Sequence, residues 1–115
     1  MKNYNLLEIL IQNGIDLNSR DKLGWGLLHY AAQNTLIEIG SLLISNGANL
    51  EIEDNYGNTP LWRAVFESKG RGEFIHLLLS AGADRNKPNK SNITPYDLAN
   101  NIANFDVKQF FLTNL

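Results

Sequence analysis

Cysteine is absent from this chain of 115 residues, and histidine occurs only twice. Without cysteine there is no disulfide, no thiolate zinc site and no cysteine nucleophile. His29 and His76 form no obvious acid and base combination, and no glycine loop carries the Lys-Ser/Thr pair of a phosphate site. We therefore expect no catalytic residue, no cofactor and no metal site, and we predict that the protein is not an enzyme.

An excess of one charge and a long apolar run are also lacking. Ten Lys and Arg against twelve Asp and Glu give a net charge of -2, which is too balanced for a general attraction to nucleic acid. The apolar runs, such as 77–79, are only a few residues long, and the N-terminus has no secretory signal pattern. These absences predict a cytoplasmic protein with neither a nucleic acid nor a membrane as partner.

An internal repeat is the main positive feature of the sequence. The segment NGANL at 46–50 recurs as AGADR at 81–85, and an earlier version, NGIDL, stands at 13–17. A second marker, DNYGNTPLWRA at 54–64, matches 89–99, and a degenerate copy covers 21–32. The markers keep one register, with a period of roughly 33 residues, so the chain is predicted to be built from stacked units.

These markers resemble the ankyrin repeat family, whose unit is a turn and two antiparallel helices with a Thr-Pro-Leu-His-x-Ala signature. The resemblance covers essentially the whole chain. It implies an all-α fold, an ankyrin-repeat solenoid of stacked helix-turn-helix units with protruding turns or short hairpins. It divides the single domain 1–115 into a half-repeat at 1–20, repeats at 21–53 and 54–88, and a capping repeat at 89–115.

The half-repeat leaves two interpretations of the N-terminus open. Its first helix is missing, so the chain either begins natively with a half-repeat or was cut from a longer array. The initiating methionine favours the native start.

Helix starts and turns are marked by residue types with a known conformational preference. Thr59 and Thr94 are predicted N-caps, each followed by a proline at the first helical position. Gly26 and Leu27 replace this pair in repeat 21–53, so its first helix should begin less firmly. Positive φ angles are expected at two sets of positions, in the turns at Gly24, Gly57 and Asn92 and at the ends of the second helices at Gly14, Gly47 and Gly82.

The apolar residues are distributed unequally between the two helices of each unit. Leu28 and Leu61 are expected to fill the space between helices, and small alanines on the first helices allow close packing. The second helices carry more apolar residues, in segments expected at 6–11, 39–44, 74–79 and 107–112. Each apolar face is buried only against the next repeat. The family resemblance implies that His29 hydrogen-bonds the turn region, and His76 is expected on the outer side.

The resemblance implies protein recognition by the turn tips and the exposed side of the first helices. Trp, Tyr and Arg dominate binding energy when they are desolvated at an interface. We hypothesise that Trp25 and Tyr56 are anchors, and we expect either Trp62 or Phe66 to pack between repeats instead. The predicted protein-binding residues are Leu23, Trp25, Tyr30, Asn34, Tyr56, Asn58, Trp62, Arg63, Phe66, Lys69, Arg71 and Ile93.

Two basic features have alternative interpretations. The two-residue insertion lies in the loop 68–72, where Lys69 and Arg71 form either a contact loop or a tolerated surface insertion. With Arg85, Lys87 and Lys90 they make a basic cluster in the sequence. No aromatic residues alternate with these cations, so a solvated surface or a charge-steered protein partner is favoured over a phosphate-binding patch.

A narrower resemblance leads to a specific hypothesis of function. The segment 57–66, the Lys-Gly-Arg-Gly insertion and the segment 101–107 are similar to small bacterial ankyrin proteins that serve as immunity partners of polymorphic toxins. This resemblance implies a non-catalytic protein that binds and blocks a cognate toxin and is a monomer when free. The alternative is a general scaffold or adaptor that binds a host or regulatory partner.

Overall fold

The computed structural model describes residues 3–102 and 106–112. The described residues form helices and turns without a β-strand, as the sequence predicted. The seven helices are α1 (Asn3–Gln12), α2 (Leu27–Gln33), α3 (Ile37–Ser45), α4 (Pro60–Glu67), α5 (Glu73–Ser80), α6 (Pro95–Asn101) and α7 (Gln109–Leu112).

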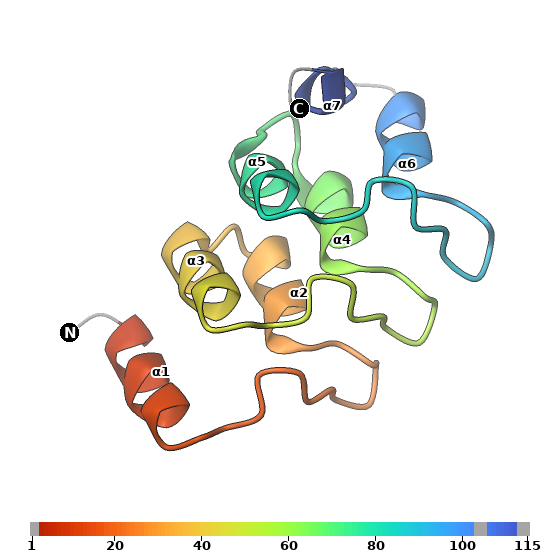
Figure 1. Cartoon of the computed structure of the whole chain (residues 1–115). Coiled ribbons are helices and arrows are strands. Elements are labelled where there is room, and N and C mark those ends of the chain that lie inside the picture. Colours follow the sequence, from red (N-terminus) through yellow and green to blue (C-terminus); the bar gives the residue numbers. More distant parts are fainter. Residues whose placement is uncertain (1–2, 103–105, 113–115) are drawn as a thin grey trace.

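The helices stack in two rows (Figure 1). The outer row contains α1, α3 and α5, and the inner row contains α2, α4 and α6. Long turns extend beyond the inner row, on the side away from the outer helices. Each helix packs mainly on its neighbours in the stack, so the molecule is elongated, with extents of 42 × 27 × 23 Å.

Side-chain caps begin two of the inner helices, as predicted. The Thr59 hydroxyl accepts a hydrogen bond from the Trp62 backbone N–H, with Pro60 in the first turn of α4. Thr94 and Asp97 form a reciprocal capping box at the start of α6. Helix α2 follows Gly26, which has no side chain to accept such a bond.

Left-handed backbone stands where the sequence predicted it. Gly14, Gly47 and Gly82 follow the ends of the outer helices with φ angles of +81°, +87° and +102°. Asn92 has a φ angle of +63° in the third turn, where the first two turns have glycine. Asparagine tolerates this conformation better than other residues with a side chain.

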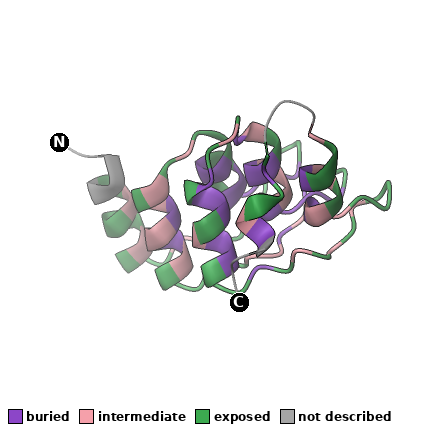
Figure 2. Ribbon diagram, turned by 90° about the horizontal axis from the view of Figure 1, so that it is seen from above, coloured by how far each residue is buried: buried purple, intermediate pink, exposed green. Residues whose placement is uncertain are grey.

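The core is a continuous layer between the two rows of helices (Figure 2). Leu28 and Leu61 are fully buried, as predicted, and alanines of the inner helices lie between neighbouring repeats. Gly40 of α3 lies against the ring of Phe74, and a Cβ atom at Gly40 would be 2.6 Å from that ring. Glycine therefore allows α3 and α5 to pack closely.

The C-terminal helix is shorter than the sequence predicted. Helix α7 begins at Gln109, so Val107 and Lys108 precede it, although both were assigned to a helical segment. Val107 and Phe111 are nevertheless buried in the core. The apolar pattern of the sequence shows which residues of this segment are buried. It determines the first residue of a four-residue helix only weakly. Residues 103–105 of the segment 101–107, and residues 113–115, lie outside the described residues.

Helix α1 is the only outer helix without a paired inner helix among the described residues, and equivalent leucines show the consequence. Leu10 of α1 has the same register position as Leu43 of α3, yet Leu10 is 39% exposed and Leu43 is completely buried. We expect Leu43→Ala to lower the free energy of unfolding by about 3 kcal/mol and Leu10→Ala by less than about 1.5 kcal/mol. Urea denaturation of the two variants checks this, and equal losses would contradict it.

Candidate functional site

Three turn tips share one hydrogen-bonded framework. In each turn the first residue donates its backbone N–H to the carbonyl of the fifth, over 3.0 Å, from Asp21 to Trp25, from Asp54 to Asn58 and from Asn89 to Ile93. In the same turns the side-chain Oδ1 of the first residue accepts backbone N–H groups of the third and fifth residues. The Asp or Asn at the first position therefore fixes the shape of the tip.

Neighbouring turns are joined to one another. The Asn55 N–H donates to the Leu23 carbonyl, and the Lys90 N–H donates to the Tyr56 carbonyl, each over 3.0 Å. The Asn55 side chain also donates to the Lys22 carbonyl over 2.7 Å. The tips thus form a continuous row, and residues that are 32 to 34 positions apart in sequence become neighbours.

His29 connects α2 to the second turn. Its Nε2 lies 2.8 Å from the Asn58 carbonyl, and its Nδ1 accepts the Gly26 N–H over 3.1 Å. Nδ1 can accept only when it carries no proton, so the buried ring is neutral with its proton on Nε2. Burial lowers the pKa of His29. His29 therefore has the structural role that the sequence predicted, and its bond to Gly26 supports the start of α2.

Exposed apolar side chains stand on the row of tips. Leu23 lies in the first turn, Tyr56 in the second and Ile93 in the third, and all three are exposed. Tyr56 is 72% exposed, although its backbone is held by hydrogen bonds to Asp54 and Lys90. A large side chain on a fixed backbone loses little conformational freedom on binding, which favours affinity.

A cluster of aromatic rings around Arg63 continues this surface along the inner helices. The Arg63 guanidinium carbon lies 4.7 Å from the Trp25 ring centroid and 5.0 Å from that of Phe66. Phe66 stacks on Trp62, with 5.5 Å between their centroids, and is 55% exposed. Arg63 also pairs with Glu67 over 3.3 Å, so its charge is already balanced within the protein.

Tyr30 connects this cluster to the first turn. Its ring packs on Trp25, with 4.8 Å between the centroids, and its hydroxyl donates to the Asp21 carboxylate. That hydrogen bond lowers the pKa of Asp21 and raises the pKa of Tyr30. The arrangement presents rings and amides to solvent and places no nucleophile beside a base.

Comparison with known proteins agrees with this architecture. A family model described as ankyrin repeats (3 copies) matches residues 1–89 of the 115. The chain belongs to the ankyrin repeat family. Ankyrin repeats form scaffolds for binding other proteins, which is the general function of this chain.

Relatives of this ankyrin chain include viral and animal proteins. It is 31% identical over 104 residues to ankyrin repeat protein L271 of Acanthamoeba polyphaga mimivirus, covering 90% of this chain and 14% of the relative. Against ankyrin repeat protein FPV031 of Fowlpox virus it is 30% identical over 117 residues, covering 97% and 34%. Against neurogenic locus notch homolog protein 1 of Homo sapiens it is 39% identical over 59 residues, covering 51% and 2%. The chain thus spans at most about a third of these relatives, and their names state no catalytic activity.

One predicted contact residue is wrong, and two others are partly covered. Asn58 is only 6% exposed, because its amide and carbonyl groups bond Asp54, His29 and Asn89 inside the ankyrin stack. Trp25 and Trp62 are half-buried by the Arg63 cluster. Sequence position alone could not show this, because the exposed Tyr56 at the turn tip and the buried Asn58 are only two positions apart in the chain.

Other predicted contact residues are exposed at the ankyrin surface. The Asn34 side chain donates to the Tyr30 carbonyl at the end of α2 and remains exposed. Lys69 and Arg71 are exposed in the loop between α4 and α5. The pairing of Glu67 with Arg63 sets the charge of the cluster. The four-residue spacing of these two on a helix was the signal available in the sequence.

The basic cluster of the sequence separates in space. Lys87 pairs with Glu53 over 3.2 Å, and Arg85 donates to the Phe111 carbonyl and lies over its ring. Lys69 and Arg71 belong to the α4–α5 loop, and Lys90 belongs to the third turn. The five cations do not form one phosphate-binding patch.

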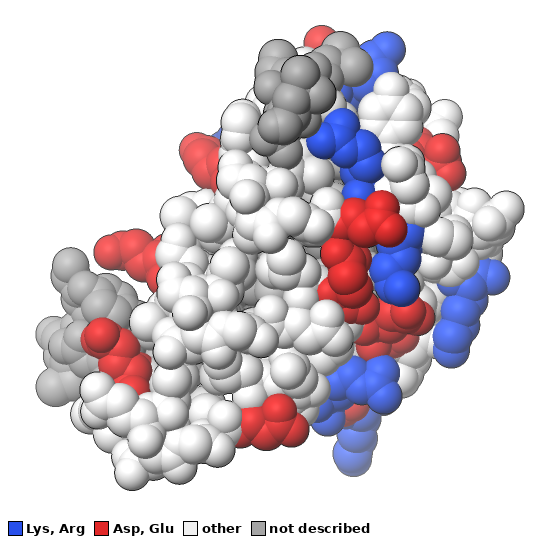
Figure 3. Space-filling model, viewed as in Figure 1, with Lys and Arg blue, Asp and Glu red and all other residues white. Residues whose placement is uncertain are grey.

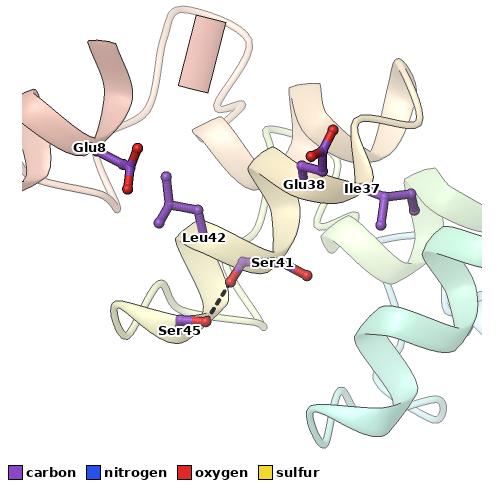
Figure 4. A pocket seen from close by; sticks show the side chains of 6 residues that line it. All are labelled: Glu8, Ile37, Glu38, Ser41, Leu42 and Ser45. Atoms are coloured by element: carbon purple, nitrogen blue, oxygen red, sulfur yellow. Dashed lines mark hydrogen bonds between the residues drawn. The ribbon is translucent and has the colours of Figure 1, made fainter. Parts of the chain in front are cut away.

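A hollow of about 390 Å³ lies between α1 and α3 (Figure 4). Its lining includes the carboxylates Glu8 and Glu38, and Ser45 donates to the Ser41 carbonyl beside them. No group of three potential metal ligands is present in the part of the chain that the structure describes. Among the same residues, every helix is too short to cross a lipid bilayer.

Proposed function

We propose that this ankyrin chain binds one protein partner through a single surface, called here the tip–helix surface. It is made of Leu23, Tyr30, Tyr56, Phe66 and Ile93, with Trp25, Trp62 and Arg63 beneath and between them. Tyr56 supports this proposal most strongly, because a 72% exposed aromatic ring on a rigid turn is not needed for the core. Asn34, Lys69 and Arg71 lie at the margin of the surface.

The proposed organisation follows the repeat boundaries 1–20, 21–53, 54–88 and 89–115. Helices α2 and α4 of the two complete repeats supply the centre of the surface, and the turns of three successive units supply its edge. As part of the same proposal, the protein is cytoplasmic and is a monomer when free.

Display of peptide fragments from the source organism's proteome tests the proposal with the full chain as bait. We expect Tyr56→Ala combined with Phe66→Ala to weaken binding of the selected ligand about thirtyfold or more, because exposed aromatic anchors carry much of the binding energy. Leu6→Ala is the matched control, since Leu6 is 60% exposed but lies on α1. Circular dichroism confirms that each variant is folded. Unchanged affinity of the double variant would remove the tip–helix surface as the site.

A toxin is the narrower candidate for the partner. In that case the ankyrin chain would act by covering the toxin's active site or substrate surface, without turnover. The viral and animal relatives favour the alternative, a scaffold or adaptor. Co-expression with a toxic product of the adjacent gene distinguishes an immunity protein from an adaptor. An immunity protein restores the growth that this product inhibits and loses this ability with Tyr56→Ala and Phe66→Ala. An adaptor leaves the toxicity unchanged.

A further inference from the structure

Charge is distributed unequally between the two sides of the stack. The outer helices α1, α3 and α5 contain Glu8, Glu38 and Glu73 and not one Lys or Arg within their bounds. Figure 3 shows this side as a broad surface with few charged side chains, and most visible Lys and Arg lie toward the turns. Although the net charge is only -2, the charged residues of the outer helices are all acidic, and most visible basic residues lie toward the turns.

Four cations border the tip–helix surface at opposite ends of α4. Lys22 and Lys90 belong to the turns on either side of the Tyr56 turn, to which both are joined by hydrogen bonds. Lys69 and Arg71 lie in the loop that follows the last residue of α4, close in sequence to Phe66. An eight-residue helix is roughly 12 Å long, so the two pairs are separated by at least about that distance.

These cations are not used inside the protein. Lys22, Lys69, Arg71 and Lys90 are exposed, and their side chains make no ion pair or hydrogen bond with the residues that the structure describes. Three acidic groups near this surface are engaged within the protein. Asp21 accepts the Tyr30 hydroxyl, Glu67 pairs with Arg63, and Asp97 caps α6. The surface is thus aromatic at its centre, where Arg63 and Glu67 balance each other's charge, and cationic at both ends.

From this arrangement, which rests on the proposed function, we infer that the partner segment carries an apolar centre and acidic side chains on both flanks. Its apolar residues cover Tyr56 and Phe66, and its carboxylates face Lys22 and Lys90 at one end and Lys69 and Arg71 at the other. Charges at the edge of an interface mainly accelerate association, whereas buried anchors slow dissociation.

The geometry favours a peptide over a nucleic acid as the occupant. A phosphate backbone needs a continuous track of cations, and here the central Arg63 is neutralised by Glu67. Two cationic ends separated by an aromatic centre instead match a short segment with charged flanks.

The test selects ligands for the full-length chain from a random peptide display library and measures their binding kinetics. The selected peptides are expected to be enriched in Asp and Glu around Leu, Phe or Trp. Reversing all four charges with Lys22→Glu, Lys69→Glu, Arg71→Glu and Lys90→Glu should lower the association rate constant about tenfold or more and remove most of its salt dependence. The dissociation rate constant should change little. Lys108→Glu, an exposed charge beside α7, is the matched control and should change neither constant.

The anchor variant separates this inference from the proposed function. Tyr56→Ala with Phe66→Ala should instead raise the dissociation rate constant. If charge reversal has no effect while the anchor variant still weakens binding, the inference is wrong and the proposed function stands. If neither variant has an effect, both are wrong. Selection of no peptide, or tighter binding of single-stranded oligothymidylate than of any selected peptide, also overturns the inference.

Discussion

Replacing His29 with alanine is expected to lower the free energy of unfolding by about 3 kcal/mol. The ring is completely buried, and its loss leaves the Gly26 N–H without its partner and removes one of the two hydrogen bonds that the Asn58 carbonyl accepts. A buried polar group without a partner costs about 1–3 kcal/mol, and the cavity left by the ring adds to this. Urea denaturation followed by circular dichroism measures the loss. His76→Ala, at an exposed site on α5, is the matched control and should cost less than about 0.5 kcal/mol.

The same histidine should make the fold sensitive to acid. Its pKa is lowered by burial in the folded chain, while the unfolded chain has an ordinary value near 6.5. Between these two values the unfolded state binds more protons than the folded state, so stability falls as the pH decreases below about 6.5. Protonation of Nδ1 would also remove its bond from Gly26. Between about pH 7.5 and pH 5 we expect His29→Gln to have a smaller loss of stability than the unmodified chain. Equal pH slopes would show that His29 is not the sensor.

Gly24→Ala is expected to have a comparably large effect, about 3 kcal/mol. Gly24 has a φ angle of +81°, and a Cβ atom there would be 2.6 Å from the Asn55 backbone nitrogen. The variant therefore combines left-handed strain of about 1–2 kcal/mol with a backbone clash where the first two turns are joined. The backbone at position 24 and the backbone of Asn55 cannot move apart without loss of the hydrogen bond from the Asn55 N–H to the Leu23 carbonyl.

Gly47→Ala isolates the first of these two costs. Gly47 has a similar φ angle of +87°, but no atom would lie within 4 Å of its added Cβ. We expect a loss of only about 1 kcal/mol, from backbone strain alone. Thermal denaturation of both variants measures the difference. If they are equally destabilised, close contact between turns is not what requires glycine at position 24.

Local chemistry explains why much of the fold could be predicted from sequence. Thr59-Pro60 and Thr94-Pro95 encode helix starts through their own side chains and fixed φ angles, so no distant residue is needed. Gly47 and Asn92 encode left-handed backbone in the same way. The start of α7 was predicted two residues too early, because a four-residue helix depends on packing rather than on its own sequence.

The candidate site was only partly predictable, because exposure depends on contacts between repeats. Tyr56 and Asn58 lie in one turn, yet the first is exposed and the second is bonded to His29 from the preceding unit and Asn89 from the following one. Trp25 was expected to project as an anchor, but Arg63, 38 positions later in the chain, lies against its ring. No local pattern records a contact at that separation.

The sequence by itself determined the ankyrin repeat, its period, the turn geometry and the absence of thiol chemistry. The turns follow from residue types at short spacing, the period from recurrence of the same motifs, and the lack of thiols from composition. The tertiary structure decided which aromatic residues remain accessible, which cations are already paired and where the unpaired cations lie. These properties depend on stacking, which places residues about 33 positions apart side by side and covers some of them completely. The aromatic centre with cationic ends is a property of the stacked repeats and not of any one of them.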